Sequence, residues 1–361
     1  MPARGTEFLG YARTRTDELR RWVTLTIAWS MLGRSPMDAD AAIDDPRAAP
    51  LPADELRRMQ QRSDARGLLR LAGHLAAIGA AGWLHTLALR SGQSLAPALT
   101  TVLLGFPLVT MFATMHESVH RTAFESRWLN DSVAWLGGLL SFYNSSFYRP
   151  YHGWHHRFTQ LPGQDPELED RKPTSVASYV LEISGLPWWI GKLRTHLRLA
   201  AGRTKSYGFL NEKTGPRVVR SVRLQLLTYC AAMALSLWLG YPYFIVYWLL
   251  PVVAAQPLLR AILLAEHMGC SESRDMLSNT RTTYTLWPVR FLMWEMPYHA
   301  DHHRYPALPF FELKSAHRRL APYLRHVART GYSGLHWDIV KGLRKRPTII
   351  DNGFSRGGER D

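Results

Sequence analysis

Cysteine is almost absent from this chain. Its 361 residues include only Cys230 and Cys270, too few for a disulfide framework or for an iron–sulfur cluster held by thiolates. We also expect no cleavable signal peptide, because residues 1–21 are rich in charge and contain no continuous apolar run. These absences argue against a disulfide-stabilised protein and against an electron carrier with its own iron–sulfur cluster.

Motifs for nucleic acids and nucleotides are missing as well. No zinc-finger, helix-turn-helix or RNA-binding signature is present, and no flavin or dinucleotide fingerprint. The net charge of +15, from 44 Lys and Arg against 29 Asp and Glu, therefore favours anionic lipid over nucleic acid. The 13 Trp and 15 Tyr residues support this interpretation, because their rings settle at the membrane–water interface.

Four apolar segments are predicted to cross a bilayer, whose hydrocarbon core is about 30 Å thick. They are residues 68–89, 96–115, 224–239 and 243–265. The turns within the two resulting hairpins, 90–95 and 240–242, carry one basic residue, Arg90, whereas the long polar stretch 116–223 carries fifteen. By the positive-inside rule, the turns face outward and the long polar segments lie in the cytoplasm.

Further helices are predicted outside these spans. Residues 16–32 read as a short interfacial or docked helix, and a charged helix is expected over 53–70. Apolar residues within 186–197 share one helical face, as in a helix on a membrane surface or a soluble helix packed on its own domain. Pro251 and Pro257 should kink the fourth span. The predicted divisions are an N-terminal cytoplasmic or interfacial segment (1–67), a membrane catalytic domain (68–346) and a flexible tail (347–361).

Histidine is concentrated in three clusters. Eight of the fifteen histidines form them: His116 and His120; His152, His155 and His156; His299, His302 and His303. Spacings of three and four should place the imidazoles of one cluster on one helical face. The two hairpins bring these clusters, and His267 at the end of the fourth span, to one region below the membrane. Nine imidazoles are too many for one zinc site of four ligands and suit two metal ions with four or five each.

Iron is the first choice of metal, because it accepts imidazole and suits a redox task at a membrane; copper and manganese accept imidazole as well. Five carboxylates near the clusters in sequence could orient imidazoles, or could be surface groups: Glu117, Asp165, Glu169, Glu266 and Asp301. His74 and His85 lie inside the first span. We expect them to be buried polar side chains with partners on a neighbouring helix.

These residues resemble the membrane fatty acid desaturases and their hydroxylase relatives. The family pattern H-x3/4-H, H-x2-H-H and H/Q-x2-H-H is matched in order and spacing by the three clusters. The resemblance implies an all-α integral membrane fold, with four transmembrane helices in two hairpins and a helical cytoplasmic cap holding a histidine-rich di-iron site. It also implies an additional ligand after the fourth span, which His267 matches. Residues 279–283 and 297–303 look like bacterial acyl-lipid members, although Glu295 replaces an Asn found in many relatives.

The resemblance also implies a reaction. Relatives use two iron ions and dioxygen to introduce a C=C bond into an acyl chain, with no catalytic residue beyond the metal ligands. Because this chain has no redox module of its own, electrons are expected from an external ferredoxin or cytochrome with its reductase. The expected location is the bacterial inner membrane, with the active site on the cytoplasmic side. The alternatives are a hydroxylase or ketolase of a lipid, carotenoid or other hydrophobic molecule, a zinc-dependent membrane hydrolase, and a non-enzymatic metal-binding protein.

Overall fold

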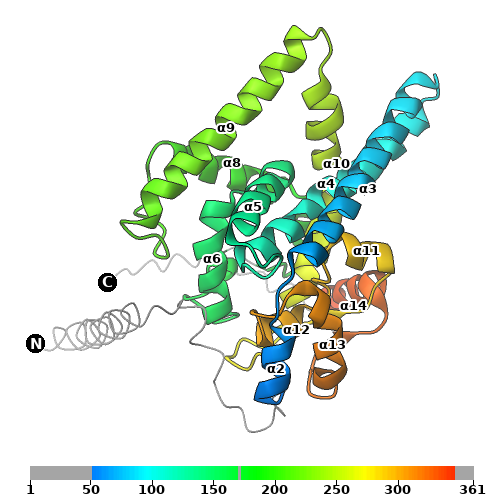
Figure 1. Cartoon of the computed structure of the whole chain (residues 1–361). Helices are drawn as coiled ribbons and strands as arrows, with labels where there is room; N and C mark the ends of the chain where they lie inside the picture. Colours follow the sequence, from blue (N-terminus) through cyan, green and yellow to red (C-terminus); the bar gives the residue numbers. More distant parts are fainter. Residues whose placement is uncertain (1–50, 170–171, 346–361) are drawn as a thin grey trace, which may run out of the picture. The chain divides into compact units, whose positions relative to one another are not determined.

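A computed structural model of the chain describes residues 51–169 and 172–345, and the regular secondary structure of these residues is almost entirely helical (Figure 1). The longest helices are α3 (Asp64–Arg90), α4 (Leu95–Val119), α9 (Thr214–Trp238) and α10 (Leu250–His267), the last preceded by the π-helical segment η3 (Ile245–Leu249). The shorter helices are α2 (Ala53–Met59), α5 (Arg127–Ser141), α6 (Ser145–Phe158), η2 (Pro166–Leu168), α7 (Val176–Ile183), α8 (Leu186–Ala200), α11 (Trp287–Leu292), α12 (His299–Arg304), α13 (Phe310–Leu320) and α14 (Gly331–Lys345). Two short strands, β1 (Thr282–Thr283) and β2 (Val327–Ala328), pair in parallel.

The four predicted spans are confirmed as helices. Within the described residues, α3, α4, α9 and the stretch Ile245–His267 are each long and apolar enough to cross a membrane. They present large apolar side chains to the outside, such as Leu99 on α4, 71% exposed, and Leu227 on α9, 66% exposed. Extended apolar surface of this kind is unfavourable in water and favourable against lipid acyl chains. The chain is therefore an all-α membrane protein.

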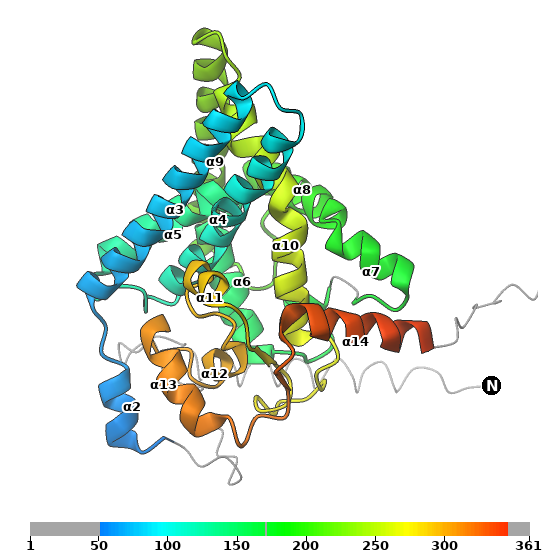
Figure 2. The same ribbon diagram turned by 90° about the vertical axis from the view of Figure 1, so that its right-hand side faces the viewer.

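Helix α4 is the centre of the bundle and packs against α3, α5 and α10 (Figure 2). Every residue from 107 to 119 is buried. The contact between α4 and α10 depends on Gly105, because a Cβ atom there would lie 2.0 Å from the carbonyl oxygen of Pro251. Small residues allow membrane helices to approach closely. The close contact brings His116 and His267, near the ends of α4 and α10, to the same end of the bundle.

Two predicted features of these helices differ in detail. The irregularity in the fourth span is the π-helical segment η3, and Pro251 follows it in the first turn of α10, where the missing N–H of proline is tolerated. The single charged helix expected over 53–70 is wrong. Helix α2 ends at Met59, and α3 starts afresh at Asp64 because the Ser63 side chain caps it by accepting a hydrogen bond from the Arg66 N–H.

The first-span histidines have partners on neighbouring elements, as predicted. The Nε2–H of His74 donates to the Pro107 carbonyl at 2.8 Å, and its Nδ1 accepts from the Trp294 indole N–H at 3.3 Å. The Nδ1 of His85 lies 2.9 Å from the Thr100 hydroxyl on α4. Among the described residues, neither histidine belongs to a group that could hold a metal ion.

Amphipathic helix α8 presents its apolar face outward. Leu193 and Leu197 are 49% and 65% exposed, whereas His196 and Leu199 are buried. An exposed leucine face on a helix beside the bundle favours the prediction of a helix on the membrane surface. The predicted helix over 16–32 and the tail 347–361 lie outside the described residues, as does most of the N-terminal segment.

Candidate metal centre

The clusters lie on four helices that meet at one end of the bundle. His116 is in the last turn of α4 and His120 caps its end, α6 carries the second cluster, His267 ends α10, and α12 consists largely of the third cluster. All nine imidazoles are at least nine-tenths buried. The structure therefore brings together all the histidines that the sequence nominated, and it separates them into two groups.

The first group contains five histidines: His116, His120, His152, His156 and His302. Four Nε2 atoms form a closed ring with edges of 3.0–3.2 Å. In order around the ring, these atoms belong to His116, His302, His156 and His152. The His120 ring lies 4.6–5.1 Å, centroid to centroid, from all four. Ligand nitrogens about 2.1 Å from an ion and at right angles to one another would be about 3.0 Å apart. The ring thus has the dimensions of a metal site.

The second group contains four histidines: His155, His267, His299 and His303. The Nε2 atoms of His267 and His299 are 3.0 Å apart. The ring of His155 lies 4.9 Å from that of His267 and 5.0 Å from that of His303. The two groups touch where the His156 and His303 rings stack at 4.1 Å. The structure therefore has two adjacent groups of histidines that could each hold a metal ion.

The expectation that each cluster occupies one helical face is wrong for the two clusters of three. Residues four apart share a group, as His152 and His156 do on α6 and His299 and His303 do on α12. The intervening histidine, His155 or His302, belongs to the other group. Adjacent positions on a helix point about 100° apart, so the two neighbouring imidazoles of a H-x2-H-H sequence point in different directions and can meet different helices. Helices α6 and α12 therefore each contribute to both groups.

Polar partners hold the outward Nδ1 atoms of three of the rings, so that their Nε2 atoms face inward. The Tyr148 hydroxyl lies 3.3 Å from Nδ1 of His116 and 3.2 Å from Nδ1 of His152. The Asp165 carboxylate is 2.9 Å from Nδ1 of His155. Such contacts fix the ring orientation and make the inward nitrogen a better metal ligand. Tyr148 was not nominated from the sequence, although its position four residues before His152 on one helix was a usable signal.

The other nominated carboxylates have different contacts. Glu117 accepts a hydrogen bond from the Phe310 N–H, and Asp301 binds both the His317 Nδ1 and the Thr282 hydroxyl at 2.9 Å. They hold α13 and α12 in place, so the expectation that they orient clustered imidazoles is not met.

The two remaining carboxylates that were nominated differ from each other. The Oε2 of Glu266 is 3.6 Å from the Nε2 of His299. Glu169 is exposed. Glu295 pairs with Arg70 and Arg290 at 3.4 and 3.7 Å and belongs to neither histidine group.

Burial keeps most of the imidazoles neutral. Desolvation lowers the pKa of His302 to about 3, with a smaller contribution from the charge of His155. His155 differs, because burial lowers its pKa but the carboxylates of Glu167 and Asp165 outweigh that effect and raise it. Neutral imidazole is the form that binds metal. The two carboxylates beside His155 therefore favour its protonated form, unlike that of His302.

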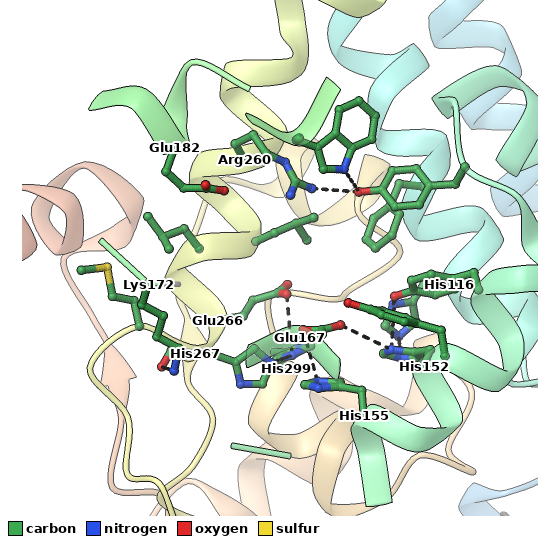
Figure 3. Close-up of a pocket in the computed structure, with 18 of the residues that line it drawn as sticks. His116, His152, His155, Glu167, Lys172, Glu182, Arg260, Glu266, His267 and His299 are labelled. Atoms are coloured by element: carbon green, nitrogen blue, oxygen red, sulfur yellow. Dashed lines mark hydrogen bonds and ion pairs between the residues drawn. The ribbon is translucent and has the colours of Figure 1, made fainter. Parts of the chain in front are cut away.

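A cavity of about 190 Å³ opens beside the histidines. Figure 3 shows its floor, formed by His116, His152, His155, His267 and His299 together with Glu167 and Glu266. In its roof, Arg260 and the Trp188 indole donate hydrogen bonds to the Tyr143 hydroxyl at 2.8 and 3.1 Å. The sequence analysis did not identify three residues of this cavity as site residues: Glu167, Lys192 and Arg260. Only Glu167 carries a sequence signal, because it lies two residues after Asp165.

The residues present fit two metal ions. The four contacts of 3.0–3.2 Å around the Nε2 ring cannot all be hydrogen bonds, since each ring nitrogen offers either one N–H or one lone pair. Several buried ring nitrogens have no hydrogen-bond partner, including both nitrogens of His120 and the Nε2 atoms of His155 and His303. Cations placed within the two groups would satisfy them. Imidazole-rich sites of this size suit iron, copper or zinc.

The chain belongs to the fatty acid desaturase family, whose sequence pattern matches residues 92–333. This range contains all nine clustered histidines and three of the four membrane-length helices in full. The protein is therefore an oxidoreductase of the membrane desaturase class.

Its curated relatives include sn-1 oleoyl-lipid 12-desaturases from cyanobacteria. The chain is 23% identical to that of a Picosynechococcus species over 273 residues, which cover 69% of this chain and 75% of the relative. It is 24% identical to that of a Synechocystis species over 276 residues, covering 70% and 76%. It is 23% identical to that of Arthrospira platensis over 268 residues, covering 65% and 70%.

Proposed function

We propose that this protein is an oxygen-dependent di-iron desaturase that introduces a C=C bond into the acyl chain of a membrane lipid. The observation that carries the proposal is the division of nine buried histidines into two adjacent metal-competent groups at one end of a membrane bundle. One buried ion would need only one such group. Two groups in contact would hold two metal ions side by side, which suits a reaction in which both ions act on one oxidant.

The nine histidines would hold the two irons, five at one position and four at the other. When bound, iron with dioxygen supplies the oxidising power to remove two hydrogens from adjacent unactivated carbons. The chain's own residues bury the site, orient the imidazoles through Tyr148 and Asp165, and provide the cavity beside His116 and His299 in which the reacting carbons would lie.

The proposed location is the bacterial inner membrane, with the metal centre on the cytoplasmic side. The support is the distribution of basic residues between the two hairpin turns and the long polar stretch 116–223. Both hairpin turns lie at the ends of the long helices away from the histidine groups (Figure 2). The histidine groups would therefore share the compartment of the cellular electron donors.

An external ferredoxin or cytochrome with its reductase would supply the electrons. A basic surface lies close to the five-histidine group, because Arg121 directly follows His120 and has Arg62, Arg127 and Arg149 around it. Asp131 pairs with Arg149 at 2.6 Å and with Arg121 at 3.7 Å. Four arginines against one aspartate leave a positive surface that suits an acidic carrier.

A hydroxylase or ketolase is the second candidate, and the lining of the cavity favours it. Lys172, Glu182, Lys192 and Arg260 border the space beside the histidines. An acyl chain requires apolar contacts at its reacting carbons. Charged side chains there suit a substrate with a polar group close to the reacting carbon.

Metal analysis and turnover assays separate these functions. Protein purified without chelators is expected to contain two irons per chain. It should convert a lipid acyl chain only when both dioxygen and a reductase with its carrier are added. Mass spectrometry of the product distinguishes loss of two hydrogens from gain of one oxygen. One zinc per chain, or undiminished activity without oxygen, would refute the oxidative function and indicate the hydrolase.

A further inference from the structure

We propose that the carboxylates of Glu167 and Glu266 complete the four-histidine metal position, so that one position has only nitrogen ligands and the other has nitrogen and oxygen ligands. The proposal rests on the di-iron function above and adds two ligands that the histidine pattern does not contain. It is carried by the placement of both carboxylates on the cavity floor, facing the same group of imidazoles (Figure 3).

Glu167 is positioned by the residue that also positions His155. Asp165 accepts a hydrogen bond from the Glu167 N–H at 2.9 Å and lies 2.9 Å from the His155 Nδ1. As a result, Oε2 of Glu167 lies 3.5 Å from the inward Nε2 of His155. Its other oxygen is 4.0 Å from Nδ1 of His152 in the five-histidine group. Glu167 therefore reaches toward the second metal position from the side nearest the first.

Glu266 approaches the same position from α10. It immediately precedes His267, and its Oε2 is 3.6 Å from Nε2 of His299. That nitrogen is also the one that lies 3.0 Å from Nε2 of His267. The second oxygen of Glu266 is buried without a hydrogen-bond partner, and the residue is only 7% exposed. A buried carboxylate oxygen without a partner is costly unless a cation or a proton satisfies it.

The distances favour a shared cation over direct hydrogen bonds. Separations of 3.5 and 3.6 Å between carboxylate oxygens and imidazole nitrogens are too long for a good hydrogen bond. Donors bound to one ion at about 2.1 Å are separated by roughly 3–4 Å, depending on the angle at the ion. Glu167 beside His155 and Glu266 beside His299 each have the separation that two ligands of one ion would have, and Glu167 also forms a possible metal group with His152 and His155.

The two groups differ in this respect. The five-histidine group already surrounds its position with a ring of four nitrogens and a fifth imidazole beside it. The four-histidine group is open toward the cavity, and both carboxylates stand on that open side. Iron accepts carboxylate as well as imidazole. Two carboxylates would also offset half of the charge of two divalent ions in a buried place.

The test compares the double variant E167Q/E266Q with wild type and with E182Q. Glutamine keeps the size of the side chain and removes its charge, and Glu182 lines the same cavity without a place in either histidine group. Purified proteins would be loaded with ⁵⁷Fe under anaerobic conditions. Iron per chain would be measured by mass spectrometry and the two iron environments by Mössbauer spectroscopy. Neither readout depends on turnover.

Wild type and E182Q are expected to hold two irons with two distinct Mössbauer signals. The double variant should lose iron selectively, falling toward one iron per chain, and chelator competition should show at least a tenfold weaker second site. If the double variant does not purify folded, E167Q and E266Q separately should each change one signal and leave the other unchanged. Retention of both irons with unchanged signals, or loss of both irons together, would overturn the proposal. Failure of wild type to bind two irons would instead refute the proposed function.

Discussion

Replacing Gly105 with alanine is expected to separate the two helices that bring His116 and His267 together. The added Cβ would lie 2.0 Å from the Pro251 carbonyl oxygen and 2.7 Å from the Cβ of Ala255, whereas real Cβ atoms essentially never approach other heavy atoms closer than 3.0 Å. The closest obstacle is backbone, so no change of rotamer can relieve it. Helices α4 and α10 must therefore move apart by about 1 Å at this crossing.

Two opposing effects determine how much Gly105→Ala changes the free energy of unfolding. Inserting a methyl group into a packed interior typically costs about 1–3 kcal/mol, and a backbone obstacle places Gly105→Ala near the upper end. Alanine in place of glycine in a helix recovers roughly 0.5–1 kcal/mol. A net loss of about 2 kcal/mol follows, which is more than a tenfold change in the ratio of folded to unfolded protein. Because α4 and α10 both end at the histidine groups, iron content should fall as well.

Gly79→Ala on α3 is the matched control, because nothing lies within 4 Å of a Cβ at that position. Thermal unfolding of both variants in detergent, with iron per chain measured on the same samples, checks the prediction. Gly105→Ala should unfold several degrees below wild type and Gly79→Ala should not. Equal stability and equal iron content in the two variants would show that the close approach of α4 and α10 does not determine the site.

Three further predictions concern the ligands, their partners and the topology. His267→Ala should purify folded with less iron and little activity, whereas His85→Ala, which removes a buried histidine bonded to α4, should retain both irons; equal iron content would make His267 structural. Asp165→Asn should weaken iron binding by about 10–100-fold in chelator competition, because the anionic partner of an imidazole is lost; an unchanged affinity would contradict that role. A single cysteine at Gln93 should be labelled from outside intact cells and one at Lys213 should not, so labelling at Lys213 would refute the two-hairpin topology.

Much of the membrane architecture could be predicted from the sequence, because its signals are local. A span is determined by a run of apolar residues as long as the bilayer core, and the four expected spans all appear as helices. The histidines carry their information in the same way. Their identity and spacing were sufficient to nominate the nine imidazoles that the structure gathers into two groups. Local patterning also predicted that His74 and His85 would be buried with partners on a neighbouring helix, since a polar side chain inside a span must be satisfied within the protein.

The assignment of each histidine to one of two groups was decided by tertiary structure. His155 lies between His152 and His156 in sequence but joins His267 and His303 in space, because it points in a different direction from α6 toward another pair of helices. The contacts of Glu167 and Asp301 were also invisible in the sequence. Glu167 reaches the histidine groups because Asp165 fixes the turn that carries it, and Asp301 on α12 contacts His317 on α13. Sequence spacing determines which side chains share a helical face, but only the packing of several helices determines what each face meets.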